Sequence, residues 1–155
     1  MEAEERFISS LESSKRHLQV ADHLVYTSFP IVKDLKLLLR SLESLALCLI
    51  NAINALLQYE YVYKKIQLYS QARDNFQTFK RKSPNYNITP SQLSTIIEIL
   101  ELAEKHKKSP LEFSKNNRII IMSDTPAVLS LDIVKIKAYI LEVKDILRKI
   151  SLVIR

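Results

Sequence analysis

The 155-residue sequence contains no glycine, no tryptophan, one cysteine and three histidines. Glycine tolerates a positive φ and lets a ligand approach the backbone. Its absence argues against phosphate-binding loops, dinucleotide fingerprints and type I′ or II′ hairpin turns in their usual form. The single cysteine, Cys48, allows no internal disulfide and leaves the common structural zinc sites without thiolates. We therefore expect a helical fold with no cofactor and no metal.

A membrane-length hydrophobic run is also missing. The longest stretch without an acidic or basic side chain runs from Ser44 to Tyr59. A bilayer span needs about 20 mostly apolar residues, so we expect a core helix here and no membrane partner. The segment Met1–Glu5 is acidic where a secretory signal would be basic, which predicts a cytoplasmic protein.

The composition, with 47% hydrophobic and 26% charged residues, is typical of a globular domain and indicates one domain over residues 1–155. Apolar residues recur at three- and four-residue steps, which predicts helices over about 3–26, 31–68, 71–82, 90–107 and 131–154. The predicted fold class is all-α: an up-and-down four-helix bundle with a short extra helix and an irregular connector.

Local signals predict where these helices begin and end. Pro30 should end the first helix, and Thr89-Pro90-Ser91-Gln92 forms a capping box that should begin the fourth. A second box, Ser109-Pro110-Leu111-Glu112, predicts a short helix that ends near Lys115. The β-branched run 118–122 predicts an extended connector that packs on the bundle or pairs with a second copy of the chain.

The helix predicted over 31–68 is apolar around most of its circumference. One apolar row includes Leu35, Leu42 and Leu49, and a second row includes Ile50 and Ile53. At 100° per residue the apolar arc covers about 260°. Such a helix either lies at the centre of the fold or packs against a second copy, and we expect a homo-oligomer, most simply a homodimer, through residues 35–57.

One short motif bears on function. Arg16-His17, followed after five residues by His23, resembles the signature of the HEPN superfamily of small helical bundles. The resemblance implies an often dimeric protein that cleaves RNA, with His23 as general acid or base, Arg16 stabilising phosphate charge and His17 as the polar neighbour. The alternative is that Arg16 and His23 are exposed residues of an amphipathic helix. The segments 23–30 and 106–113 also resemble small uncharacterised archaeal helical proteins, a likeness that implies no activity.

The charge is concentrated in residues 64–118, whose excess of basic side chains equals the net charge of +6 for the whole chain. Two basic groups occur there. The first group consists of Lys80, Arg81 and Lys82, and the aromatic residues Phe76, Phe79 and Tyr86 lie beside it in the sequence. The second group consists of Lys105, Lys107, Lys108 and Arg118. If the two groups converge, they would bind the phosphates of RNA while the aromatic rings stack on bases. Alternatively, Lys105–Lys108 offsets a helix dipole and the phenylalanines face the core.

Evidence for an enzyme is sparse, because no nucleophile elbow, catalytic triad or helical metal motif is present. Glu98, Glu101 and His106 share one predicted helix, but their spacing favours solvated surface. The sequence therefore favours a non-enzymatic helical interaction or regulatory module. An RNA-binding or RNA-cleaving protein of HEPN type is the alternative hypothesis.

Overall fold

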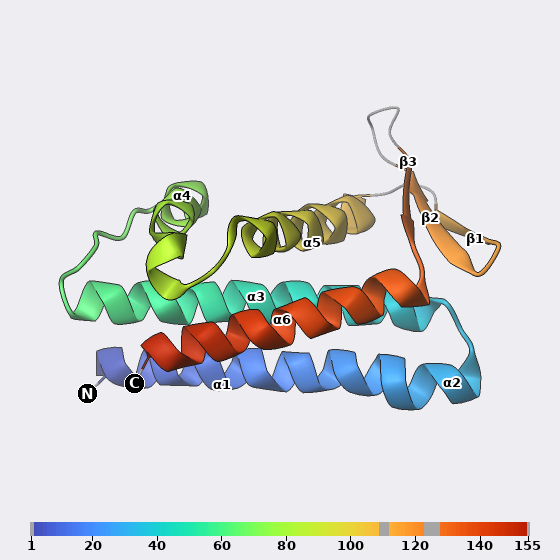
Figure 1. Ribbon diagram of the computed structural model, residues 1–155, viewed down its shortest axis with the longest axis horizontal. Coiled ribbons are helices and arrows are strands. Elements are labelled where there is room, and N and C mark those ends of the chain that lie inside the picture. Colours follow the sequence, from blue (N-terminus) through green and yellow to red (C-terminus); the bar gives the residue numbers. More distant parts are fainter. Residues whose placement is uncertain (1, 109–111, 123–127, 155) are drawn as a thin grey trace.

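The computed structural model describes residues 2–108, 112–122 and 128–154, and it is 80% helical (Figure 1). The helices in chain order are α1 (Glu2–His23), the π-helix η1 (Leu24–Ser28), α2 (Phe29–Val32), α3 (Lys36–Val62), α4 (Ala72–Lys82), the 3₁₀ turn η2 (Ser83–Tyr86), α5 (Pro90–Lys108) and α6 (Ile133–Val153). The strands are β1 (Glu112–Lys115), β2 (Arg118–Met122) and β3 (Val128–Leu131). The prediction of a mostly helical protein is confirmed, whereas the connector that was predicted to be irregular forms a small three-stranded antiparallel sheet.

Helix α3 lies at the centre of the fold. It packs against α1, α4, α5 and α6, and Figure 1 shows α1 along one side of it and α4 and α5 along another. In its first apolar row Leu42 and Leu49 are buried, and Leu35, just before α3, is half-buried; in the second row Ile53 is buried and Ile50 is 42% exposed. Most of the apolar width of α3 is thus covered within one chain, and Leu47 and Ile50 are the large apolar side chains of this helix before Tyr61 that stay exposed. The homodimer stays a prediction.

A pair of hydrogen bonds explains the one polar position on the buried face of α1. Ser14 is fully buried, and its Oγ donates to the Cys48 carbonyl oxygen of α3 at 2.8 Å. The same hydroxyl lies 3.3 Å from Cys48 Sγ. Burial raises the pKa of the Cys48 thiol to about 11, although the contact with Ser14 opposes this shift. The thiol is therefore protonated and inert, as expected of a structural cysteine.

The predicted end of the first helix at Pro30 is wrong. The helical path continues through η1 and α2 to Val32, and the chain turns at Lys33, where φ is 58°. Pro30 lies in the first turn of α2, where a missing N–H removes no helical hydrogen bond. The second long helix, by contrast, is shorter than predicted: it ends at Val62. Lys64, two residues later, has a φ of 58°, which is not a helical conformation.

The capping box at the start of α5 is confirmed. Thr89 Oγ1 accepts from the Gln92 backbone N–H at 3.1 Å, and Gln92 Oε1 accepts from the Thr89 backbone N–H at 3.2 Å. The short helix that the second capping box predicted is not found at Glu112–Lys115, which is strand β1. The other residues of that box, Ser109, Pro110 and Leu111, lie outside the described residues.

The sheet is antiparallel with the strand order β1-β2-β3. Lys115 pairs with Arg118, which leaves a two-residue turn at Asn116 and Asn117, with φ of 54° and 62°. Positive φ at both positions is what a type I′ turn requires, and asparagine tolerates it. The lack of glycine therefore does not exclude such a hairpin, contrary to the expectation. The run 118–122 forms the central strand, and its two edges pair with β1 and β3 of the same chain.

Candidate functional site

An apolar groove of about 850 Å³ lies between α3, α4 and α5. We refer to it as the groove. Its α3 wall is formed by Ile50, Ile53, Asn54 and Leu57, its α5 wall by Ile97, Leu100, Glu101 and Glu104, and its α4 end by Ala72, Arg73, Asn75 and Phe76. Figure 1 shows that α3 and α5 run in opposite directions along this site. Both long walls repeat at three- and four-residue steps, so the groove follows about two helical turns.

The apolar floor of the groove is open to solvent. Ile50 is 42% exposed, and Phe76, Ile97 and Leu100 are half-buried. Leu47, one turn before Ile50 on α3, is also 42% exposed. Apolar side chains that line an open groove are typical of a binding surface, whereas single exposed apolar residues need no explanation.

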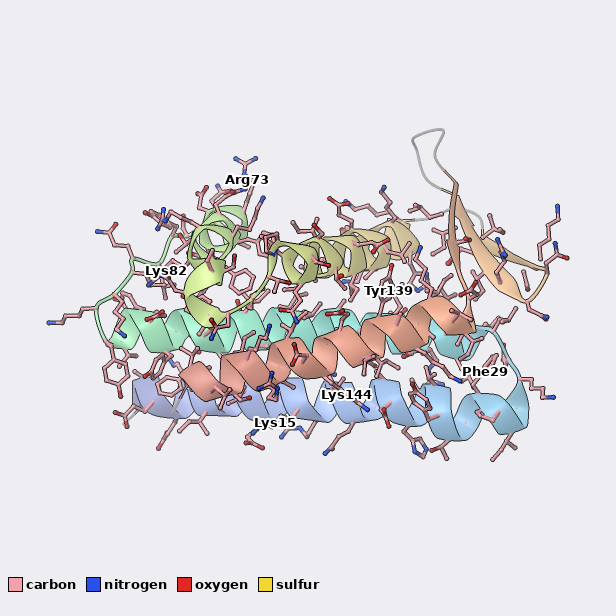
Figure 2. All side chains as sticks on the ribbon, viewed as in Figure 1. Lys15, Phe29, Arg73, Lys82, Tyr139 and Lys144 are labelled. Atoms are coloured by element: carbon pink, nitrogen blue, oxygen red, sulfur yellow. The ribbon has the colours of Figure 1, made fainter. Side chains whose placement is uncertain are left out.

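Charged side chains border the groove. Glu104 forms an ion pair with Lys108, with 3.2 Å between its carboxylate oxygen and Lys108 Nζ, and both side chains are exposed on α5. Glu101 and Arg73 form no ion pair with any residue in the described ranges. Figure 2 shows Arg73 on α4, at the end of the groove away from the sheet. The α5 wall therefore presents negative charge and the α4 end a positive one.

The residues predicted for RNA cleavage share helix α1 but not a cleft. Arg16 and His23 are exposed, and His17 is half-buried. His23 lines a hollow of about 390 Å³ between α1 and α6 with Asp22 and Lys144, but Arg16 and His17 do not line it. Lys144 Nζ donates to Asp22 at 2.8 Å, and Figure 2 shows Lys144 on α6 beside α1. RNA cleavage stays a prediction that this arrangement within one chain does not favour.

The two predicted basic groups lie far apart. Lys80, Arg81 and Lys82 end α4, whereas Lys105, Lys107 and Lys108 end α5. Helix α5 begins beside α4 and has 19 residues, which corresponds to about 27 Å at 1.5 Å per residue. Arg118, the fourth member of the second group, is exposed at the start of β2, and strand β2 contacts α5. The structure thus does not merge the two groups into one patch.

Two of the three aromatic residues beside the first group, Phe79 and Tyr86, face the protein interior. Phe79 and Tyr86 are buried and stack at 6.4 Å between ring centroids, and Phe76 stacks on Phe79 at 5.8 Å. Tyr86 donates its hydroxyl to Glu60 Oε1 at 2.9 Å. Burial and this contact raise the pKa of Tyr86 well above its ordinary value. The alternative that the phenylalanines face the core is therefore confirmed for Phe79, whereas Phe76 is half-buried; Tyr86 is buried beside Phe79.

Sequence reasoning missed the buried carboxylate of Glu60. This α3 residue is 4% exposed, and Lys82 Nζ donates to its Oε1 at 3.3 Å (Figure 2 labels Lys82). A buried carboxylate needs a charged or hydrogen-bonding partner, so Lys82 serves to neutralise Glu60. Lys82 is consequently not available as a phosphate ligand in this fold.

Sequence reasoning also missed a contact that we call the His106 bridge, formed by His106, Glu43 and Glu112. His106 Nε2 lies 2.7 Å from Glu43 Oε1 of α3, and His106 Nδ1 lies 2.8 Å from Glu112 Oε2 of β1. Burial alone lowers the pKa of His106, but the hydrogen bonds and charges of the two carboxylates raise it above its ordinary value. The imidazolium form donates from both nitrogens, so the protonated ring joins α5 to α3 and β1.

No group of three or more histidine, cysteine or acidic side chains that could hold a metal occurs in the described ranges. One described helix, α3, has the length and composition of a membrane span, but 56% of its apolar window is buried in the fold, as in a core helix.

Comparison with protein-family models, curated proteins and solved structures finds no match to this chain. The resemblance to the HEPN superfamily therefore stays a prediction.

Proposed function

We propose that this protein is a non-enzymatic helical interaction module whose groove binds an amphipathic helix of a partner protein. The observation that carries the proposal is the open apolar lining, with Ile50 42% exposed in the wall of a groove of about 850 Å³. A concave, mostly apolar surface with a few polar groups at its border is the usual form of a binding site.

The shape of the groove favours a helix as the occupant. Ile50, Ile53 and Leu57 on α3 face Ile97 and Leu100 on α5, and both sets follow helical spacing. Two adjacent helices with such rows leave a seam that a third helix fills with apolar residues at positions i, i+3, i+4 and i+7. The seam is about two turns long, which is enough for four such anchor residues.

The charges favour a particular kind of helix. Glu101 and Glu104 border the α5 side, and Arg73 borders the α4 end. These charges would match a bound helix that carries lysine or arginine on the flank facing α5. The end of that helix facing α4 would carry an acidic residue. Such pairs at the border of an interface contribute mainly to orientation and partner choice.

A synthetic peptide tests the proposal. We would measure, by fluorescence anisotropy, the binding of a labelled helical peptide about four turns long, with leucine on one face and lysine on one flank. Ile50→Asp places a charge on the floor of the groove. The control Leu141→Asp makes the same kind of change on α6, where Leu141 is 72% exposed outside the groove. We expect Ile50→Asp to weaken binding at least about tenfold, equivalent to about 1.4 kcal/mol, and Leu141→Asp to leave it unchanged.

A charge exchange tests the orientation. Glu101→Lys should weaken binding of the lysine peptide and strengthen binding of a peptide with glutamate at the same positions. The proposal is wrong if a scrambled peptide binds equally well, or if Ile50→Asp and Leu141→Asp have the same effect on the helical peptide.

A second copy of this chain is the competing occupant. The exposed apolar residues within 35–57 are Leu47 and Ile50, and Ile50 lines the groove. A homodimer through this helix would therefore cover the proposed site. Sedimentation of the wild-type protein as a monomer supports the partner helix, whereas a dimer that Ile50→Asp dissociates would assign the groove to a second copy.

A further inference from the structure

A second cleft, of about 390 Å³, lies at the opposite end of α3 from the groove's α4 end. We refer to it as the sheet-end cleft. It is lined by Lys36, Leu39, Arg40, Glu43, His106, Glu112, Ser114 and Ile119. These residues come from the first turns of α3, the last turn of α5, and strands β1 and β2. The fold therefore brings together side chains that are far apart in the sequence.

The carboxylates in this cleft are already occupied. Glu43 and Glu112 each hold one nitrogen of His106, at 2.7 Å and 2.8 Å. Lys36 and Arg40 are exposed, and neither forms an ion pair with a residue in the described ranges. With the His106 imidazolium included, the lining carries more positive than negative charge. At the start of α3 the backbone N–H of Lys36 already donates to Asp34 Oδ1 at 3.0 Å, so the positive charge of the cleft comes from its side chains.

Further basic residues lie on the elements that form the cleft. Lys107 and Lys108 end α5, and Lys115 and Arg118 flank the β1–β2 turn; all four side chains are exposed, and Lys108 is paired with Glu104. A single phosphate ion would contact few of these positive charges. The backbone of a nucleic acid strand would contact more of them, because each contact with a phosphate releases counterions from the strand and adds to the affinity.

We propose that the sheet-end cleft binds a phosphate group of a nucleic acid strand, with Arg40 and Lys36 as its charged ligands and the Ser114 hydroxyl as a hydrogen-bond donor. The guanidinium of Arg40 can donate two parallel hydrogen bonds to phosphate oxygens, and Lys36 supplies a point charge. A strand that leaves the cleft around the β1–β2 turn would then meet Lys115 and Arg118, which alternate with Ser114 and Ile119 and so face the other side of the hairpin. This site differs from the α4 group of Lys80, Arg81 and Lys82, and it does not depend on the groove.

The test compares two double variants with the same change of charge. Lys36→Glu/Arg40→Glu alters the cleft, whereas Lys80→Glu/Arg81→Glu alters the end of α4. A labelled oligouridine of about twelve nucleotides is titrated by fluorescence anisotropy at several salt concentrations. We expect the cleft variant to weaken binding by more than about tenfold and to reduce the logarithmic salt slope by about 1.4, since each contact with a single strand contributes about 0.7. The α4 variant should retain most of the affinity.

A second measurement separates a strand from a free anion and reports on folding. Backbone amide NMR signals of Arg40, Ser114 and Ile119 should shift with oligouridine, and only weakly with inorganic phosphate at the same phosphate concentration. The same spectra show whether each variant is folded. Equal weakening by both double variants, or shifts of equal size with inorganic phosphate, would overturn the proposal. So would an absence of oligouridine binding at low salt.

Discussion

The His106 bridge makes the stability of this protein depend on pH in a defined direction. The pKa of His106 is raised in the folded state. The bridge therefore stabilises the fold fully below the unfolded-state pKa of about 6.5, and this stabilisation is lost as pH rises through the higher folded-state pKa. The neutral ring has one N–H, so it can donate to Glu43 or to Glu112 but not to both. Lys36 and Arg40 line the same cleft.

The expected size follows from the contacts. A hydrogen bond to a charged group contributes about 1.5–3 kcal/mol. The side chain of Glu43 is 46% exposed and that of Glu112 is 24% exposed, which weakens both interactions through solvent screening. We therefore expect the free energy of unfolding to fall by about 1 kcal/mol between about pH 5 and pH 9 from this bridge alone.

Urea unfolding followed by circular dichroism measures this effect when the wild type is compared with His106→Gln over the same pH range. The variant keeps a polar side chain but cannot titrate, so the other ionisable groups cancel in the difference between the two proteins. The difference should be largest at low pH and shrink as pH rises. Parallel pH profiles of the two proteins, or a difference that grows with pH, would refute the reasoning.

Three further predictions concern buried or strained residues. Cys48, with its pKa raised to about 11, should react with a thiol reagent only as fast as the protein unfolds; rapid labelling of the native protein by a spectroscopic thiol assay would contradict this. Glu60→Gln should lower the free energy of unfolding by about 2 kcal/mol or more because it leaves Lys82 without a buried partner. Adding Lys82→Met should recover part of that loss in urea unfolding, and no recovery would contradict the pairing. Asn117→Ala should cost about 1 kcal/mol at a φ of 62°, whereas Asn117→Gly should not; equal thermal stability of the two variants would exclude strain at this position.

Local signals predicted much of the helical framework. The capping box at Thr89 and Gln92 acts between residues three positions apart, and its geometry is determined by the backbone turn that it begins. The apolar periodicity likewise located α3 and α6, because burial on one side imposes the helical repeat. The end of the first helix was predicted wrongly because Pro30 is also compatible with the first turn of a new helix.

Long-range contacts explain what could not be predicted. His106 and Glu43 are 63 residues apart, and Glu60 and Tyr86 are 26 residues apart, so neither pair leaves a local pattern in the sequence. The groove depends on how α4 and α5 lie against α3, which composition does not specify. The hairpin at Asn116 and Asn117 was also not predicted, although its signal is local. Glycine was the residue expected at positions with positive φ, and here two asparagines adopt that conformation.

The packing of α1 along α3 has a consequence for the order of folding. These two helices are consecutive long elements joined by a short connection, and they contact each other along their length. Contacts between near neighbours in sequence form with little loss of loop entropy. Helix α6 reaches the same core only after the chain has passed through α4, α5 and the sheet. A helical hairpin of α1 and α3 should therefore assemble early and carry an uncovered leucine surface until α6 docks, which makes that interval the one in which a chaperone would bind most readily.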